Sequence, residues 1–334
     1  MIEYSGRQLA EHGNTQYNQP MKLIQQSFRI EARHSGHRLD QALQQLLPDF
    51  SRSRIQQWIQ QGFVCLNRET CKPRQKVYDG DTVDLDVPEQ SVLADQPQAV
   101  DFRVVYDDED IIVVDKPAGL VVHPAAGNPD HTLVNGLLDF DAGLEQLPRA
   151  GIVHRLDKDT TGLMVVARNL AAHHWLVDEL QARRVSREYL ALVRGAVTAG
   201  RRIETDIGRH PQNRKKMAVV NNGKPAVTHF QVLRRFQHYT LVELQLETGR
   251  THQIRVHMAH LQYPLVGDPV YGGRAQLPAG IVPELGERIR EFRRQALHAR
   301  RLGFTHPRTR EAVTFEAPLP ADFETLLEAL EAHD

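Results

Sequence analysis

Several features that would mark a secreted, membrane-bound or zinc-containing protein are missing from this sequence of 334 residues. It holds only two cysteines, Cys65 and Cys71, which are too few for a disulfide framework and lack the partners of a zinc site. No apolar run approaches the roughly 20 residues of a membrane span, and the N-terminus lacks the basic start and apolar core of a signal peptide. We therefore expect a soluble, cytoplasmic protein that has no membrane partner.

Motifs that bind nucleotide cofactors or metals are also missing. No G-x-G-x-x-G follows an expected strand, and the sequence has neither a Walker loop nor H-E-x-x-H. His252, His257 and His260 lie close together, but their spacings do not give the i, i+4 pair of a helical zinc site. We expect no cofactor and no metal, and we interpret these histidines as polar packing and contacts to RNA.

An overall excess of basic residues is missing as well, because 41 Lys and Arg residues are balanced by 42 Asp and Glu residues. Binding to nucleic acid would therefore depend on local patches. Arg52 and Arg54 lie at the expected start of a helix, where the helix dipole repels cations. Their position there favours an anionic partner. The candidates for phosphate contacts are Arg52, Arg54, Arg68, Lys72, Arg209, Arg214, Lys215 and Lys216. The alternative interpretation is a solvated basic surface.

The first part of the chain predicts a small separate unit. Residues 1–27 are polar and show no periodicity, so we expect a mobile tail. Residues 28–88 then show two amphipathic helical patterns followed by two strand patterns. The second helix would be capped by Ser51 and would bury Ile55, Trp58 and Ile59. Residues 89–100 are expected to form a linker.

Residues 101–334 predict one larger domain in which short strands and a few helices alternate. Strands are expected at residues 110–114, from residue 120 and at residues 189–193, and helices at 169–184 and around 323–330. Several strands follow one another too closely for helical crossovers. The expected fold class is therefore α+β, with a largely antiparallel mixed sheet.

Charged residues gather in a loop within residues 151–167, between two apolar segments that we expect to be strands. Arg155, Asp157, Lys158 and Asp159 lie within five positions of one another. Buried carboxylates are costly unless they are paired or used chemically, so the loop is a candidate site. The alternative is a hairpin turn in which Asp and Thr side chains cap backbone groups.

Two further positions are candidates for the same site. Thr251 is expected to cap a helix whose apolar stripe includes Ile254 and Met258, which leaves Arg255 on a different face. A half-buried arginine there would bind a carboxylate, although a surface arginine is the simpler alternative. Tyr189 is expected to share a strand face with Ala191 and Val193, and it could be an ordinary core aromatic.

Four segments together resemble the ordered motifs of one family of RNA pseudouridine synthases, the A and D type of the large ribosomal subunit. They are Lys116-Pro117-Ala118-Gly119, the loop His154-Arg155-Leu156-Asp157 with Thr160-Thr161-Gly162, Arg187-Glu188-Tyr189, and the segment from Thr248 to His257. The small unit resembles the RNA-binding module of a small-subunit ribosomal protein. The resemblance runs from about residue 28 to the end of the chain.

The resemblance implies an isomerase that converts specific uridines to pseudouridine in large-subunit (23S) ribosomal RNA without a cofactor. The RNA could be free or part of an assembling ribosomal particle. Asp157 matches the family's essential aspartate and Arg255 the arginine that pairs with it. Tyr189 matches the tyrosine over the target uracil, and Arg155 the arginine that holds the displaced base out of the RNA stack.

The chemistry leaves several alternatives open. Asp157 could attack the anomeric carbon, add to uracil, or remove a proton from the adjacent ribose carbon. Tyr189 could stack on uracil or accept the proton from carbon 5. Two other functions are conceivable: an RNA-binding ribosome-assembly factor without catalysis, and a nucleoside hydrolase in which Asp159 would be the second acid.

Overall fold

The computed structural model describes residues 23–47, 52–88, 96–124, 128, 130–213, 216–273 and 277–334. The chain divides into two compact units, residues 1–94 and residues 95–334, and each is described by itself. Among the described residues, no helix has both the length and the apolar character needed to cross a membrane.

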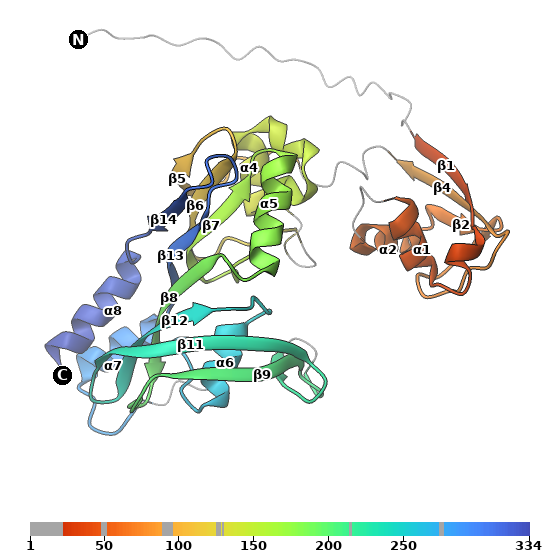
Figure 1. Ribbon diagram of the computed structural model, residues 1–334. Helices are drawn as coiled ribbons and strands as arrows, with labels where there is room; N and C mark the ends of the chain where they lie inside the picture. The colour runs from red at the N-terminus through yellow and green to blue at the C-terminus, as the bar shows by residue number, and fades with distance from the viewer. Residues whose placement is uncertain are drawn as a thin grey trace, which may run out of the picture. The chain divides into compact units, whose positions relative to one another are not determined.

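The small unit packs two helices against an antiparallel sheet of four strands, in the order β1-β4-β2-β3 (Figure 1). Its buried core joins Leu39 and Leu43 of the first helix, Ile55 and Trp58 of the second, and Val83 of the sheet. The expected order of helix, helix, strand and strand is therefore present. The elements are β1 (Leu23–Arg29), a short 3-10 helix (Ala32–His34), α1 (Leu39–Leu46), α2 (Arg52–Gln60), β2 (Val64–Leu66), β3 (Glu69–Thr70) and β4 (Thr82–Pro88).

The prediction of a tail up to residue 27 was wrong at its end, because strand β1 already begins at Leu23. This strand pairs along its length with β4. Gln25 Nε2 and Ser27 Oγ each donate a hydrogen bond of 2.8 Å to an aspartate of β4. Such an edge strand need not show apolar alternation, so its sequence looked like a tail. The rest of the expected tail, the expected cap Ser51 and most of the linker lie outside the described residues.

A buried carboxylate joins the two helices of the small unit. Asp40 of α1 is fully buried, and it accepts hydrogen bonds from Arg38, Arg52 and Gln56. Arg52 thus has an anionic partner inside the protein, which accounts for a cation at the start of α2. Burial raises the pKa of Asp40, but the hydrogen bonds from Gln56, Arg38 and Arg52 outweigh it and hold the pKa below its usual value.

The larger unit is built on a ten-stranded sheet with the order β10-β9-β11-β12-β8-β13-β7-β6-β5, in which β14 pairs with β13 (Figure 1). All pairs are antiparallel except the one between β13 and β7. The expected α+β class with a largely antiparallel mixed sheet is confirmed. The strands are β5 (Arg103–Asp107), β6 (Ile111–Lys116), β7 (Thr161–Ala167), β8 (Ser186–Arg194), β9 (Arg201–Arg209), β10 (Met217–Val219), β11 (Lys224–Arg235), β12 (Tyr239–Leu246), β13 (Leu297–Thr305) and β14 (Ala312–Glu316).

Helices cover both faces of this sheet, since alternate residues of a strand point to opposite sides. Tyr189, Ala191 and Val193 of β8 join the core that α4 and α6 cover, whereas Leu192 joins the core beneath α7 and α8. Helix α5 packs over β6 and β7 on the face opposite α4. The helices are α4 (Leu133–Phe140), α5 (Leu170–Gln181), α6 (Gln253–His260), α7 (Pro283–Glu291) and α8 (Ala321–Ala332), with 3-10 helices at Ala142–Gln146 and Pro148–Gly151.

Some expected boundaries in this unit were wrong. Residues 120–122 form no strand. Before the charged loop, Ile152 makes only an isolated bridge to Val166, so this loop has a strand on one side only. Helix α5 ends at Gln181 rather than at residue 184. The cap of α6 is His252, which has a left-handed φ of 58°, and not Thr251. Neither a left-handed cap nor a single bridge leaves a periodic signal in the sequence.

The pairing of Asp40 predicts how the small unit responds to acid. Asp40→Asn should destabilise this unit by about 2 kcal/mol, because Arg38 and Arg52 lose their charged acceptor. A carboxyl with a lowered folded pKa stabilises the protein above its unfolded pKa of about 3.9, and that stability is lost as the pH falls through the folded value. Calorimetry should show this loss for the wild type and not for Asp40→Asn. The exposed Asp79→Asn is the control, and it should behave like the wild type.

Candidate active site

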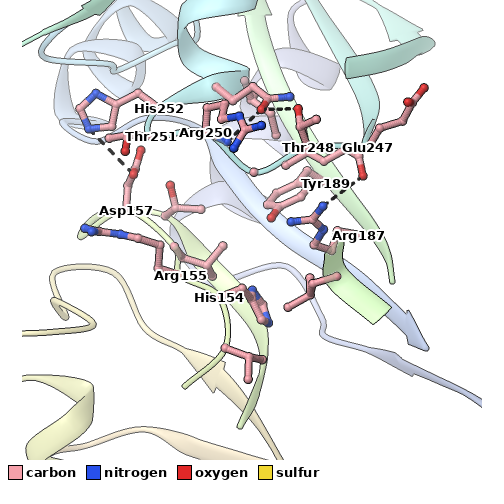
Figure 2. Close-up of a pocket in the computed structure, with 18 of the residues that line it drawn as sticks. His154, Arg155, Asp157, Arg187, Tyr189, Glu247, Thr248, Arg250, Thr251 and His252 are labelled. Atoms are coloured by element: carbon pink, nitrogen blue, oxygen red, sulfur yellow. Dashed lines mark hydrogen bonds and ion pairs between the residues drawn. The ribbon is translucent and has the colours of Figure 1, made fainter. Parts of the chain in front are cut away.

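A pocket of about 540 Å³ opens on the sheet face that carries Tyr189 (Figure 2). The charged loop before β7 forms one wall, and the segment between β12 and α6 forms another. Asp157, Tyr189 and Arg255 all line it, so the three side chains that the sequence analysis associated lie in one cavity. Arg155 lines it too, as an exposed side chain.

The centre of the pocket is an ion pair between residues 98 positions apart. Arg255 Nη1 donates a hydrogen bond of 2.9 Å to Asp157 Oδ2. The arginine is almost fully buried, while the carboxylate side chain is 19% exposed toward the cavity. No hydrogen bond to Asp157 Oδ1 occurs within the described part of the chain. One carboxylate oxygen is therefore held by the guanidinium and the other remains available.

A second carboxylate, for which the sequence analysis proposed no role, fixes this arginine. Asp268 is fully buried and accepts two hydrogen bonds from Arg255, of 2.7 Å from Nε and 2.9 Å from Nη2. Its Oδ1 also accepts the backbone N–H groups of Val270 and Tyr271. Burial raises the pKa of Asp268, but the hydrogen bonds from Arg255 outweigh it and lower the pKa. The bidentate pair orients the guanidinium so that Nη1 alone faces Asp157.

His252 faces the available oxygen of Asp157 across 3.9 Å, measured from Nε2 to Oδ1 (Figure 2). Its Nδ1 lies 2.9 Å from the hydroxyl of Tyr271, which already accepts the backbone N–H of Met217. The Oδ1 atom of Asp157 can only accept, which favours a His252 tautomer with its proton on Nε2 and the Tyr271 hydroxyl donating to Nδ1. Burial lowers the pKa of His252, although Asp157 opposes this, so the ring is neutral at pH 7.

A buried lysine, Lys116, fixes the loop that carries Asp157. Lys116 is fully buried, and its ammonium donates to the carbonyl oxygens of Pro117, Leu120 and Lys158 at 2.8–2.9 Å. Burial lowers the pKa of Lys116 to about 7, while nearby Asp159 and Asp157 oppose the shift. The lysine of the first motif thus positions the loop, a role that a turn pattern does not reveal.

In the pocket, Tyr189 lies between Asp157 and Arg187 (Figure 2). Its ring is nearly fully buried, and Arg187 lies two positions earlier on the same face of β8. Burial raises the pKa of the Tyr189 phenol, Asp157 adds to the increase, and Arg187 opposes it. The phenol is therefore neutral at pH 7. The sequence analysis placed Arg187 within a motif but proposed no role for it.

The other basic candidates are distributed over both units. Arg68 and Lys72 are exposed in the small unit, and Arg209 is exposed at the end of β9. Lys216 is half-buried next to β10, while Arg54 lies in α2 with a side chain outside the described part. Arg214 and Lys215 lie outside the described residues as well.

The three histidines with close spacing do not come together as ligands. His257 is buried and hydrogen-bonded to Thr228 and Thr205, and His252 faces Asp157 and Tyr271. Within the described ranges, the one group with metal-ligand geometry is Asp108, Asp110 and His306. These side chains are already paired with one another or with Arg308, which explains their proximity without an ion.

Two family models match this sequence. A family model described as RNA pseudouridylate synthase matches residues 110–260, and a model of the S4 domain matches residues 37–83. The chain belongs to the RNA pseudouridylate synthase family, and it is an isomerase with an N-terminal S4 domain.

Similar proteins include ribosomal large subunit pseudouridine synthase D of Xanthomonas campestris pv. campestris, which is 51% identical over 89% of both chains. The protein of the same name from Pseudomonas aeruginosa is 51% identical over 92% of this chain and 96% of its own. Among solved structures, human RNA pseudouridylate synthase domain containing 4 covers 68% of this chain and 92% of its own, with 26% identity and a TM-score of 0.54.

The pairing of Arg255 predicts that Asp268 is needed for turnover. Asp268→Asn should lower the rate of pseudouridine formation in single-turnover assays by about 100-fold, because a misplaced guanidinium no longer orients Asp157. Asp141→Asn is the matched control, since Asp141 also accepts two hydrogen bonds from one arginine, Arg168, both at Oδ2 and outside the pocket. Full turnover by Asp268→Asn would show that Arg255 holds its position without this carboxylate.

Proposed function

We propose that this enzyme converts specific uridines of large-subunit (23S) ribosomal RNA to pseudouridine, with Asp157 as its catalytic nucleophile. The observation that carries the proposal is the series of ion pairs Asp268–Arg255–Asp157, which presents one carboxylate oxygen to a nucleotide-sized pocket. The names of the relatives, which describe large-subunit synthases, support the choice of RNA.

The geometry suggests which oxygen of Asp157 acts. Oδ2 accepts the hydrogen bond from Arg255, whereas Oδ1 faces the cavity next to Nε2 of His252. Oδ1 would attack the anomeric carbon of the target ribose, and Arg255 would hold the carboxylate in position through Oδ2. Uridine and pseudouridine are isomers, so this route requires no redox partner and no group donor.

The target uridine must leave the RNA stack to reach Asp157, at a cost of a few kcal/mol. Tyr189 offers a buried ring beside the carboxylate, on which the uracil would stack. Arg155 is exposed at the pocket, where it would take the place of the displaced base. Stacking is the role for Tyr189 that its neutral phenol supports, because a neutral phenol is a poor acceptor for the carbon 5 proton.

The remaining basic residues would bind RNA phosphates and so position the substrate without reading its sequence. Arg68 and Lys72 would do so from the S4 unit, and Arg209, with Arg214, Lys215 and Lys216, from the larger one. Arg52 and Arg54 would also bind phosphates, and Arg52 forms an ion pair with Asp40 as well.

We also propose that the chain is organised as a tail, residues 28–88 as the RNA-binding module, a linker, and residues 101–334 as the catalytic domain. The two compact units support this division, with the module extended back to Leu23 by β1. The enzyme would work in the cytoplasm, on free ribosomal RNA or on an assembling particle.

Exchanging Asp157 for its isosteric amide tests the proposed nucleophile. With ribosomal RNA tritiated at uracil carbon 5, Asp157→Asn should release no tritium to water, because an amide cannot act as the nucleophile, and it should bind RNA nearly as well as the wild type. Asp159→Asn, the same exchange two residues away, should keep its turnover. A hydrolase would instead free uracil and would need Asp159, and an assembly factor would release nothing even as the wild type.

Two substitutions at Tyr189 separate stacking from proton transfer. Tyr189→Phe keeps the ring, so its single-turnover rate should fall by less than the about 100-fold that loss of a general base costs. Tyr189→Leu removes the ring and should fall further. Equal losses in both variants would assign the essential role to the hydroxyl.

A further inference from the structure

The pocket contains one buried arginine that has no anionic partner. Only 8% of Arg187 is exposed, and its Nε has no hydrogen-bond partner. Its Nη2 makes a single long contact of 3.4 Å to the carbonyl oxygen of Leu246. No ion pair of Arg187 occurs among the residues that the structure describes. Two other arginines of the same pocket, Arg183 and Arg255, are each paired with a carboxylate.

The groups around this guanidinium are neutral. His154 Nε2 accepts the backbone N–H of Val165, and burial, with a contribution from Arg187, lowers the pKa of His154 to about 3. Tyr189 is an uncharged phenol on the same strand face. Gly249 leaves the space that the guanidinium occupies, since a Cβ there would lie 2.9 Å from Arg187 Nη1. The chain thus keeps a cation in the pocket wall without a counter-ion.

An uncompensated buried charge is unfavourable, so a partner from outside the protein should complete this site. Two kinds of oxygen in the proposed substrate can carry negative charge, those of the phosphates and the carbonyl oxygens of the base once it is detached. The RNA backbone stays outside when a nucleotide is flipped, and there the exposed Arg149 can meet phosphates. The base enters beside Tyr189, where Arg187 is buried. The partner that fits Arg187 is therefore a carbonyl oxygen of uracil.

We propose that Arg187 binds a carbonyl oxygen of the flipped uracil and stabilises the uracil anion that forms when the base is detached. The inference rests on the proposed function. As Asp157 Oδ1 forms its bond to the anomeric carbon, the N–C bond breaks and its electron pair stays on N1 of uracil. That charge spreads onto the carbonyl oxygens. When carbon 5 then bonds the anomeric carbon, Asp157 departs as a carboxylate, the carbon 5 proton is released to water, and N1 takes up a proton from water, so that the product is an isomer of uridine.

A preorganised cation in a site shielded from water is an effective way to stabilise such a developing charge. A contact of Arg187 with the carbonyl oxygen at carbon 4 would also select the base. Uracil presents a carbonyl oxygen at carbon 4, whereas cytosine presents an amino group there, which a guanidinium cannot bind because both are donors.

The test replaces Arg187 with methionine, which has a similar length and no charge. Single-turnover tritium release should fall by about 100-fold, as for loss of one donor to an oxyanion, with RNA affinity nearly unchanged. Because Arg187 has no anionic partner within the described ranges, the melting temperature of the free protein should stay the same or rise. Arg184→Met is the matched control: it should keep its turnover but melt lower, because it leaves the buried Glu179 unpaired.

Gly249→Ala gives a second variant that leaves Arg187 in the sequence. The added methyl group must displace the guanidinium end, so turnover should fall while RNA affinity persists. Weaker RNA binding by Arg187→Met, with normal turnover of bound RNA, would assign Arg187 to a phosphate and overturn the proposal. A lower melting temperature of Arg187→Met with normal turnover would assign Arg187 a structural role and overturn the proposal. If the wild type itself released no tritium, the proposed function would have failed first, and this inference with it.

Discussion

The pocket depends on one chain of charges, in which Asp268 fixes Arg255 and Arg255 fixes Asp157. The inner pair is bidentate and fully desolvated, and the outer contact is a single hydrogen bond to one oxygen at the pocket. Since breaking a buried pair exposes an uncompensated charge, the three side chains hold their positions together. The result is a carboxylate that is held in one orientation at the wall of a partly buried cavity.

The surrounding structure holds these three charged side chains in place. Lys116 ties the loop of Asp157 to the turn after β6. On the other side, the buried amide of Gln253 joins the start of α6 to β11, which fixes the helix that carries Arg255. Most buried charges of the pocket are thus satisfied within the protein. Arg187 is different, because its missing partner is supplied only when substrate is bound.

The sequence predicted features that depend on local pattern or on family motifs. Alternation placed Tyr189 on the correct face of its strand, and the strand spacing indicated the antiparallel sheet. The association of Asp157 with Arg255 came from the family resemblance, since nothing in local periodicity connects residues 98 positions apart. Asp268 and the unpaired state of Arg187 could not be predicted, because both depend on which distant side chains surround a guanidinium. Strand β1 was missed because polar edge strands lack apolar alternation.

The most direct test of the central claim is a crystal structure of the enzyme with an RNA stem-loop that carries 5-fluorouridine at the target position. Fluorine replaces the proton at carbon 5, so the reaction should stop with the nucleotide still in the pocket. We predict a flipped nucleotide on the Tyr189 ring, with its anomeric carbon next to Asp157 Oδ1 and Oδ2 still bonded to Arg255. A target nucleotide that remains stacked in the RNA, or that lies away from Asp157, would contradict this prediction.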